Sequence, residues 1–166
     1  MINIILYHPE IPQNTGNILR TAMATNSVVH IIGPLPFSLD DKSFKRAGMD
    51  YLKEAKFIVY DSYEDFCSKV KVDRIYYITK YGSKVYSEVD FTDKSEDTYV
   101  MFGRESTGID KEILSAHKED TLRIPMLSTA RSLNLSNSVA IVAYEILRQK
   151  QFVGLATKDM IKKYEI

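Results

Sequence analysis

Three short polar stretches carry the side chains that could do chemistry. In the first, "PEIPQNTGNILRT", Asn17 and Arg20 are three residues apart. On a helix this spacing puts both side chains on one face near the N-terminus, where backbone N–H groups attract an anionic group such as a phosphate. The structural alternative is that Asn14 or Thr15 caps the helix and Arg20 faces solvent.

The second stretch is "FGRESTGI", residues 102–109. A glycine directly after a strand lets a ligand approach the backbone closely, and Ser106 could cap a following helix. Taken alone, the segment favours a plain turn over a ligand-binding loop. The patterns GxGxxG and GxxxxGK[ST] are absent from the sequence, which argues against a dehydrogenase-like nucleotide enzyme.

The third stretch, "RIPMLSTARSLNLSNSVAIVAYE", runs from Arg123 to Glu145. Its loop can offer backbone amides and hydroxyls while Leu133 and Leu135 stay buried, a combination that suits a flat heterocycle edged by polar groups. The alternative is a helix entry that satisfies its own backbone, with Ser136 or Asn137 as the N-cap.

Composition bounds the class of protein. The chain has 166 residues, 45% of them hydrophobic, which predicts a single domain over residues 1–166. Basic and acidic residues both number 22, so a polyanion would need a local basic patch. Cys67 is the one cysteine, and the sequence has no CxxC pair or His/Cys cluster, so we expect no disulfide, no metal site and a cytoplasmic protein. The short apolar run at the N-terminus has no basic leader and is too short to span a membrane, so it reads as a first strand.

The elements that must position these stretches alternate along the chain. Continuous β-branched and aromatic runs predict strands at 2–7, 28–33, 55–60, 74–79, 98–103 and 121–126. Helix-like segments lie between them at 15–26, 62–70 and 106–117, and a last one covers 137–149. The alternation favours an α/β fold with an open, mostly parallel sheet and flanking helices, and residues 80–97 read as a short helix or loop. Ligands then bind beyond the carboxyl ends of strands, after Ile78, Phe102 and Ile124.

Taken together, the three stretches resemble the signature regions of the SPOUT superfamily of RNA methyltransferases. The matching segments are "NTGNILR", "FGRESTGI" and "RIPMLSTARSLNLSNSVAIVAYE", in that order and spanning nearly the whole chain. The opening "LYHPEIPQNTGNILR" and the segment "DDKSFKRAGMDY" are most similar to the short tRNA 2'-O-methyltransferases that act on the wobble nucleotide at position 34, cytidine or a modified uridine. Two positions depart from the family pattern: Arg104, where proline is frequent, and Thr107, where a basic residue is common.

The resemblance implies a C-terminal trefoil knot that binds S-adenosylmethionine and releases S-adenosylhomocysteine, with no metal. It implies a cofactor site made of Ile78, Gly103, Ile124, Met126, Ser132 and Leu133, with Thr79 as a weaker candidate. It assigns the chemistry to Arg20, which either takes the proton with the help of a substrate phosphate or stabilises the alkoxide. Asn17, Asn134 and Ser132 would orient that arginine or the ribose. For RNA contacts we expect Asn14, Lys42, Lys45, Arg46, Arg131 and Tyr144.

The resemblance also implies a tRNA partner, no membrane, and a homodimer in which the arginine of one subunit faces the methyl donor of the other. The dimer would pack through the last helix, with Tyr144 near the interface. The three histidines, His8, His30 and His117, are expected to be structural rather than catalytic. The alternatives are 2'-O-methylation of rRNA or another tRNA site, and a non-catalytic RNA-binding module.

Overall fold

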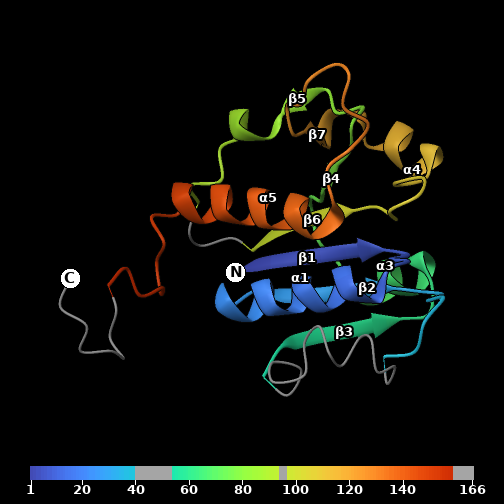
Figure 1. The fold of residues 1–166 in the computed structure, drawn as a ribbon, viewed down its shortest axis with the longest axis horizontal. Coiled ribbons are helices and arrows are strands. Elements are labelled where there is room, and N and C mark those ends of the chain that lie inside the picture. The colour runs from blue at the N-terminus through green and yellow to red at the C-terminus, as the bar shows by residue number, and fades with distance from the viewer. Residues whose placement is uncertain (40–53, 94–96, 159–166) are drawn as a thin grey trace.

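A computed structural model describes residues 1–39, 54–93 and 97–158 (Figure 1). The strands are β1 (Ile2–Tyr7), β2 (Val28–Ile32), β3 (Lys56–Tyr60), β4 (Tyr76–Ile78), β5 (Lys84–Val85), β6 (Thr98–Phe102) and β7 (Thr121–Arg123). The α-helices are α1 (Pro12–Ala24), α3 (Tyr63–Lys69), α4 (Lys111–Ala116) and α5 (Leu135–Gln149), and two 3₁₀ turns cover Tyr86–Glu88 and Lys118–Asp120. In the part of the chain described, no helix has both the length and the apolar character needed to cross a membrane.

The seven strands form one sheet in the order β3-β2-β1-β6-β4-β7-β5, and every strand pair in it is parallel. All the carboxyl ends therefore lie at one edge of the sheet. After β1 the chain moves outward to β2 and β3, and it then returns to the other side of β1. The direction of strand order thus changes between β1 and β6, the type of position where open α/β sheets bind ligands.

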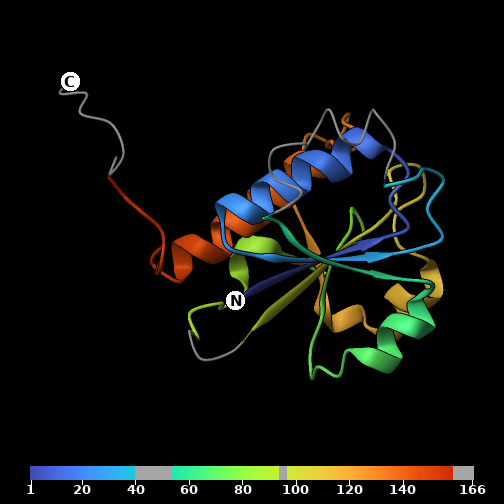
Figure 2. The same cartoon turned by 90° about the horizontal axis from the view of Figure 1, so that it is seen from below.

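Helices cover both faces of the sheet. Figure 2 shows α1 and α5 on one face and α3 and α4 on the other. Side chains of β1 alternate between the two cores, because successive strand residues point to opposite faces. Ile4 and Leu6 pack in the core beneath α1 and α5, whereas Ile5 and Tyr7 pack in the core on the α3 side. This double burial explains the continuous apolar runs of β1, β2 and β6, whereas Ile58 and Val59 of the edge strand β3 are exposed.

The α/β class with a parallel sheet is confirmed, and six strands and four helices lie at the predicted places. The bounds differ: α1 begins three residues before the predicted start, and α4 and β7 are shorter than predicted. The predicted helix caps are wrong. Helix α1 begins at Pro12 with Ile11 at its N-cap, because proline fits the first turn, so Asn14 and Thr15 lie inside the helix. Asp110, not Ser106, is the N-cap residue of α4. Asn134 caps α5 in place of Ser136 or Asn137. The 80–97 region also contains the short strand β5.

His30, on β2, has a defined protonation state inside the core. Its side chain is buried, with Nδ1 2.9 Å from the Tyr60 hydroxyl and Nε2 3.1 Å from Oδ1 of Asn3. An amide oxygen can only accept, so Nε2 carries the proton and the Tyr60 hydroxyl donates to Nδ1. Burial lowers the pKa of His30, so the native ring is neutral.

We predict that His30 makes stability depend on pH. Below its ordinary pKa of 6.5 the unfolded imidazole gains a proton that the folded, buried imidazole does not, so the free energy of unfolding falls as pH drops. His30→Gln removes this effect, so the stability advantage of the wild type over the variant should shrink between about pH 7.5 and about pH 5.5. Urea unfolding at both pH values measures it, with exposed His117→Gln as the control; a constant advantage would contradict the prediction.

Candidate functional site

A cleft of about 920 Å³ opens at the carboxyl edge of the sheet, beyond β4, β6 and β7. Three loops form its walls: residues 79–81 after β4, 103–109 after β6, and 124–134 between β7 and α5. Its volume is within the range of about 300–1,000 Å³ typical of small-molecule sites. Apolar side chains and small hydroxyl groups share the lining, which suits a heterocycle with polar edges.

Gly103 determines how tightly the second loop can turn. A Cβ atom at this position would lie 2.2 Å from the carbonyl carbon of Gly108 and 2.3 Å from the nitrogen of Ile109. The backbone N–H groups of Arg104 and Gly108 also donate to each other's carbonyl oxygens, at 3.3 and 2.9 Å. The loop is therefore a closed turn that only glycine permits at its base.

Glu105 joins this turn to the start of α1. Its carboxylate accepts hydrogen bonds from the backbone N–H groups of Glu10 (2.8 Å) and Ile11 (3.2 Å), and from the side-chain amide of Asn14 (2.8 Å). A carboxylate at this helix end is favoured by the unpaired backbone N–H groups of the first turn. The anion at the N-terminus of α1 is thus the chain's own Glu105, in the place where the sequence suggested a bound phosphate.

Glu10 makes the reciprocal contact. Its carboxylate accepts from the backbone N–H and the hydroxyl of Ser106, at 2.9 and 2.7 Å. The loops after β1 and β6 are therefore joined by carboxylates from both sides, at the place where the strand order changes. Charge-assisted bonds of this kind are shorter and stronger than neutral ones.

The loop before α5 joins the same network through Asn134. Its Oδ1 caps α5 by accepting from the backbone N–H groups of Ser136 and Asn137, at 2.9 and 3.3 Å. Its side-chain amide donates to Oδ1 of Asn14 at 3.0 Å. A continuous chain of hydrogen bonds therefore runs from Glu105 through buried Asn14 to Asn134, linking all three sequence motifs.

Arg104 fixes the other side of the β6 loop. Its guanidinium donates to Oδ1 of Asp110 at 2.8 Å and lies 5.2 Å from the centre of the Tyr7 ring. The Tyr7 hydroxyl donates to Oδ2 of the same aspartate at 2.5 Å. Burial and this bond to Asp110 raise the pKa of Tyr7 to about 12, so the phenol stays protonated as the donor. An arginine at 104 is thus accommodated by its carboxylate partner, and Thr107 lies exposed on the cleft wall.

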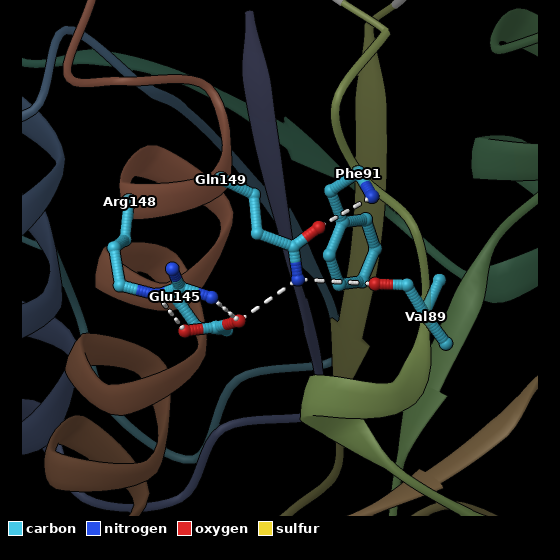
Figure 3. A network of polar contacts seen from close by, with 5 residues as sticks. All are labelled: Val89, Phe91, Glu145, Arg148 and Gln149. Atoms are coloured by element: carbon cyan, nitrogen blue, oxygen red, sulfur yellow. Dashed lines mark hydrogen bonds and ion pairs between the residues drawn. The ribbon is translucent and has the colours of Figure 1, made fainter.

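The C-terminal half of α5 is anchored through Gln149 (Figure 3). Its side-chain oxygen accepts from the backbone N–H of Phe91 at 2.7 Å, and its amide donates to the carbonyl of Val89 at 3.0 Å and to Glu145 at 2.8 Å. Glu145 also pairs with Arg148 at 2.8 Å. These bonds hold the far end of α5 to the segment that leads into β6.

The structure brings most predicted site residues together. The cleft lining includes every residue proposed for the cofactor, namely Ile78, Gly103, Ile124, Met126, Ser132 and Leu133, together with Thr79, Asn14, Asn134 and Arg131. Leu135 is buried as expected, but Leu133 is 40% exposed because its side chain lies on the cleft wall. The prediction that both leucines stay buried is wrong for Leu133.

Other predicted residues lie away from this cleft. Asn17 and Arg20 are exposed on α1, and Tyr144 is exposed on α5. Lys42, Lys45 and Arg46 lie outside the described residues, so their RNA-binding role stays a prediction. In the described part of the chain, no three His, Cys, Asp or Glu side chains are grouped as a metal site would require.

Sequence reasoning missed the carboxylates that build the site. In the sequence nothing distinguishes these acids, Glu10, Glu105 and Asp110, from other loop acids. The residues that they contact lie about 95 residues away in the chain or on the neighbouring strand β1. One signal was available: each acid lies in a loop that directly follows an apolar strand. In a parallel sheet such loops share one edge, so acids in two of them can meet.

Comparison with known proteins finds similar sequences and structures among RNA methyltransferases. The model of the SpoU rRNA Methylase family matches residues 1–144. The tRNA (cytidine(34)-2'-O)-methyltransferase of Escherichia coli (strain K12) is 41% identical over 160 residues, which cover 96% of this chain and 100% of that protein. A solved structure described as concerning 2-OH methylation of C/U34 on tRNA has a TM-score of 0.83 and 39% identity, and covers 91% of each chain. An AdoMet-bound rRNA methyltransferase from Sinorhizobium meliloti has a TM-score of 0.77 and 25% identity, over 89% of this chain and 56% of that one.

We predict that Glu105→Gln destabilises the fold. The amide replaces one accepting oxygen with an NH₂ group that faces N–H donors, so the free energy of unfolding should fall by about 1–3 kcal/mol. Glu112→Gln is the matched control, because Glu112 is an exposed acid on α4. Urea unfolding of the two variants measures the difference, and equal stability of Glu105→Gln and wild type would refute the proposed role of Glu105.

Proposed function

The chain belongs to the SpoU methylase family, and on that premise we propose that it methylates the 2'-hydroxyl of the wobble nucleotide of tRNA, cytidine or uridine at position 34, with S-adenosylmethionine as donor. The observation that carries the proposal is the meeting of all three motifs at one cleft. Relatives that share nearly the full length of the chain are named for this reaction. A tRNA substrate also fits a cytoplasmic enzyme.

The cleft fits the proposed donor in size and chemistry. Ile78, Ile124 and Met126 give an apolar wall for the adenine, and the closed turn at Gly103 brings backbone groups to the surface of the cleft. Ser132 and Leu133, in the loop before α5, also line the cleft. When bound there, S-adenosylmethionine would supply a methyl group made electrophilic by its sulfonium.

What remains for the protein is to align the ribose and to handle its proton. A 2'-hydroxyl is a weak nucleophile while protonated, so holding the oxygen in line with the methyl carbon is worth up to about 7–11 kcal/mol. None of the three histidines lines the cleft. Arg20 is the proposed group at the hydroxyl. Because an arginine holds its proton tightly, we assign it to stabilising the developing alkoxide, and the hydroxyl proton passes to solvent water.

Arg20 lies outside the cleft of its own chain, so we propose a homodimer in which Arg20 of the partner subunit completes the site. Helices α1 and α5 pack side by side on the same face of the sheet, so a dimer through α5 also involves α1 (Figure 2). Exposed residues of α5 form one stripe at helical spacing: Asn137, Ile141, Tyr144 and Arg148. The apolar members, Ile141 and Tyr144, are 37% and 48% exposed. An exposed, partly apolar stripe of this kind could form the self-complementary patch that a two-fold dimer requires.

We also propose that residues 123–138 thread a loop of the preceding chain to form the trefoil knot of the superfamily. Close packing next to this segment supports the idea. A Cβ at Gly82 would lie 2.3 Å from the carbonyl carbon of Leu122, and the Thr79 N–H donates to the Leu122 carbonyl at 2.9 Å. The turn after β4 is therefore pressed against β7, where the chain enters the proposed crossing.

Mapping 2'-O-methyl groups tests the substrate. We predict that purified protein, labelled S-adenosylmethionine and unmodified tRNA give one modified ribose, at position 34. Modification of rRNA or of another tRNA nucleotide would contradict position 34 as the target and support one of the alternative substrates. Calorimetry with the donor alone is the companion measurement, because failure of the wild type to bind it would favour a non-catalytic RNA-binding module.

Mixing two inactive variants tests the shared site. We predict that Arg20→Ala, which removes the ribose-facing group, and Ile78→Arg, which blocks the cleft, are each inactive. After subunit exchange, random pairing restores about a quarter of the wild-type sites, because a mixed dimer combines an intact cleft with an arginine from the other subunit. Methyl transfer by the mixture measures this. No recovery, with exchange confirmed by mass spectrometry, would mean that Arg20 serves its own cleft.

A further inference from the structure

Tyr81 is exposed at the rim of the cleft, although its backbone is fixed. It lies in the turn between β4 and β5, lines the cleft, and is 70% exposed. Large aromatic side chains are usually buried where they can be, since their rings carry much apolar area. Neither the proposed donor site nor the proposed dimer interface gives this ring a function.

Hydrogen bonds hold the turn that carries the ring. The Tyr81 N–H donates to Oγ1 of Thr79 at 3.3 Å, and the Gly82 N–H donates to the Thr79 carbonyl at 3.2 Å. The Arg123 guanidinium donates to the carbonyl of Lys80. Because the backbone is ordered before any ligand arrives, a ligand that stacks on Tyr81 need not order the turn when it binds.

One cation lies against the ring, and a second lines the same cleft. The ammonium group of Lys80 lies 5.1 Å from the centre of the Tyr81 ring, and Arg131 lines the same cleft from the loop before α5. With equal numbers of acidic and basic residues in the chain, a polyanion depends on such local groups. An exposed aromatic ring among cations is the arrangement with which proteins bind unpaired nucleotides: bases stack on the ring and phosphates pair with the cations.

We propose that Tyr81 is the stacking platform for an unpaired base of the RNA substrate beside the methylated nucleotide, with Lys80 and Arg131 contacting its phosphates. The inference rests on the proposed function, because it takes RNA as the substrate. An anticodon loop is a suitable ligand for such a platform, because proteins that bind RNA loops stack splayed bases on aromatic side chains. Stacking tolerates any base, so Tyr81 contributes affinity and position rather than base identity.

Steady-state kinetics of three variants tests the inference. Tyr81→Ala should raise the KM for tRNA by about 5- to 150-fold, the range that corresponds to loss of one base stack, with little change in kcat. Tyr81→Phe keeps the ring and should stay within about twofold of wild type. Tyr81→Leu keeps apolar area without a π face, so it should behave like the alanine variant. A 2-aminopurine base placed next to position 34 should be quenched by wild type and Tyr81→Phe only.

Each other outcome counts against the inference. An unchanged KM in Tyr81→Ala, or full function in Tyr81→Leu, would exclude stacking. A weaker calorimetric affinity of Tyr81→Ala for S-adenosylmethionine, with no change in the KM for tRNA, would show that the ring covers the donor instead. If the wild type is active and the Tyr81 variants behave like it, only this inference is refuted. If the wild type transfers no methyl group to tRNA, the proposed function and this inference are both overturned.

Discussion

The hydrogen bonds accepted by Glu105 are the constraint on which the rest of the site depends. Through the backbone N–H groups of Glu10 and Ile11 and the amide of Asn14, this one carboxylate fixes the turn after β6 against the start of α1. Asn14 extends the connection to Asn134 and so to the start of α5. Three loops from distant parts of the sequence are thereby held in one arrangement. Removing a partly buried bond of this kind can cost more than the bond contributes, because donors shielded from water are left without partners.

This constraint also explains why the cleft is displaced from the usual position in an open α/β sheet. Ligands normally bind where the strand order changes, which here is between β1 and β6. The carboxylates of Glu10 and Glu105 join the loops after β1 and β6 at that place, and Glu105 occupies the N-terminus of α1. The open space lies instead beyond β4, β6 and β7, enclosed by the loop before α5. The N-terminal motif therefore shapes the site through Asn14, whereas Arg20 is exposed on α1.

The sequence predicted the fold well because its strong signals are local. Continuous apolar runs marked six strands, and their alternation with helices indicated a parallel sheet. The short strand β5, at Lys84–Val85, was missed because two residues carry no periodicity. Helix caps were wrong because several polar residues compete for each N-cap, and packing selects Asn134 over Ser136 and Asn137. The site was predicted from family motifs rather than from spacing. The bonds of Glu105 reach across more than 90 residues, and no local pattern could indicate them.

A crystal structure of the chain with S-adenosylhomocysteine would show where the nucleoside binds. We expect its density in the cleft beyond β4, β6 and β7, against the turn at Gly103 and the loop that contains Ser132, with the Glu105 carboxylate still bonded to the start of α1. Density in the crevice between β1 and β6, with Glu105 displaced from the helix end, would contradict it.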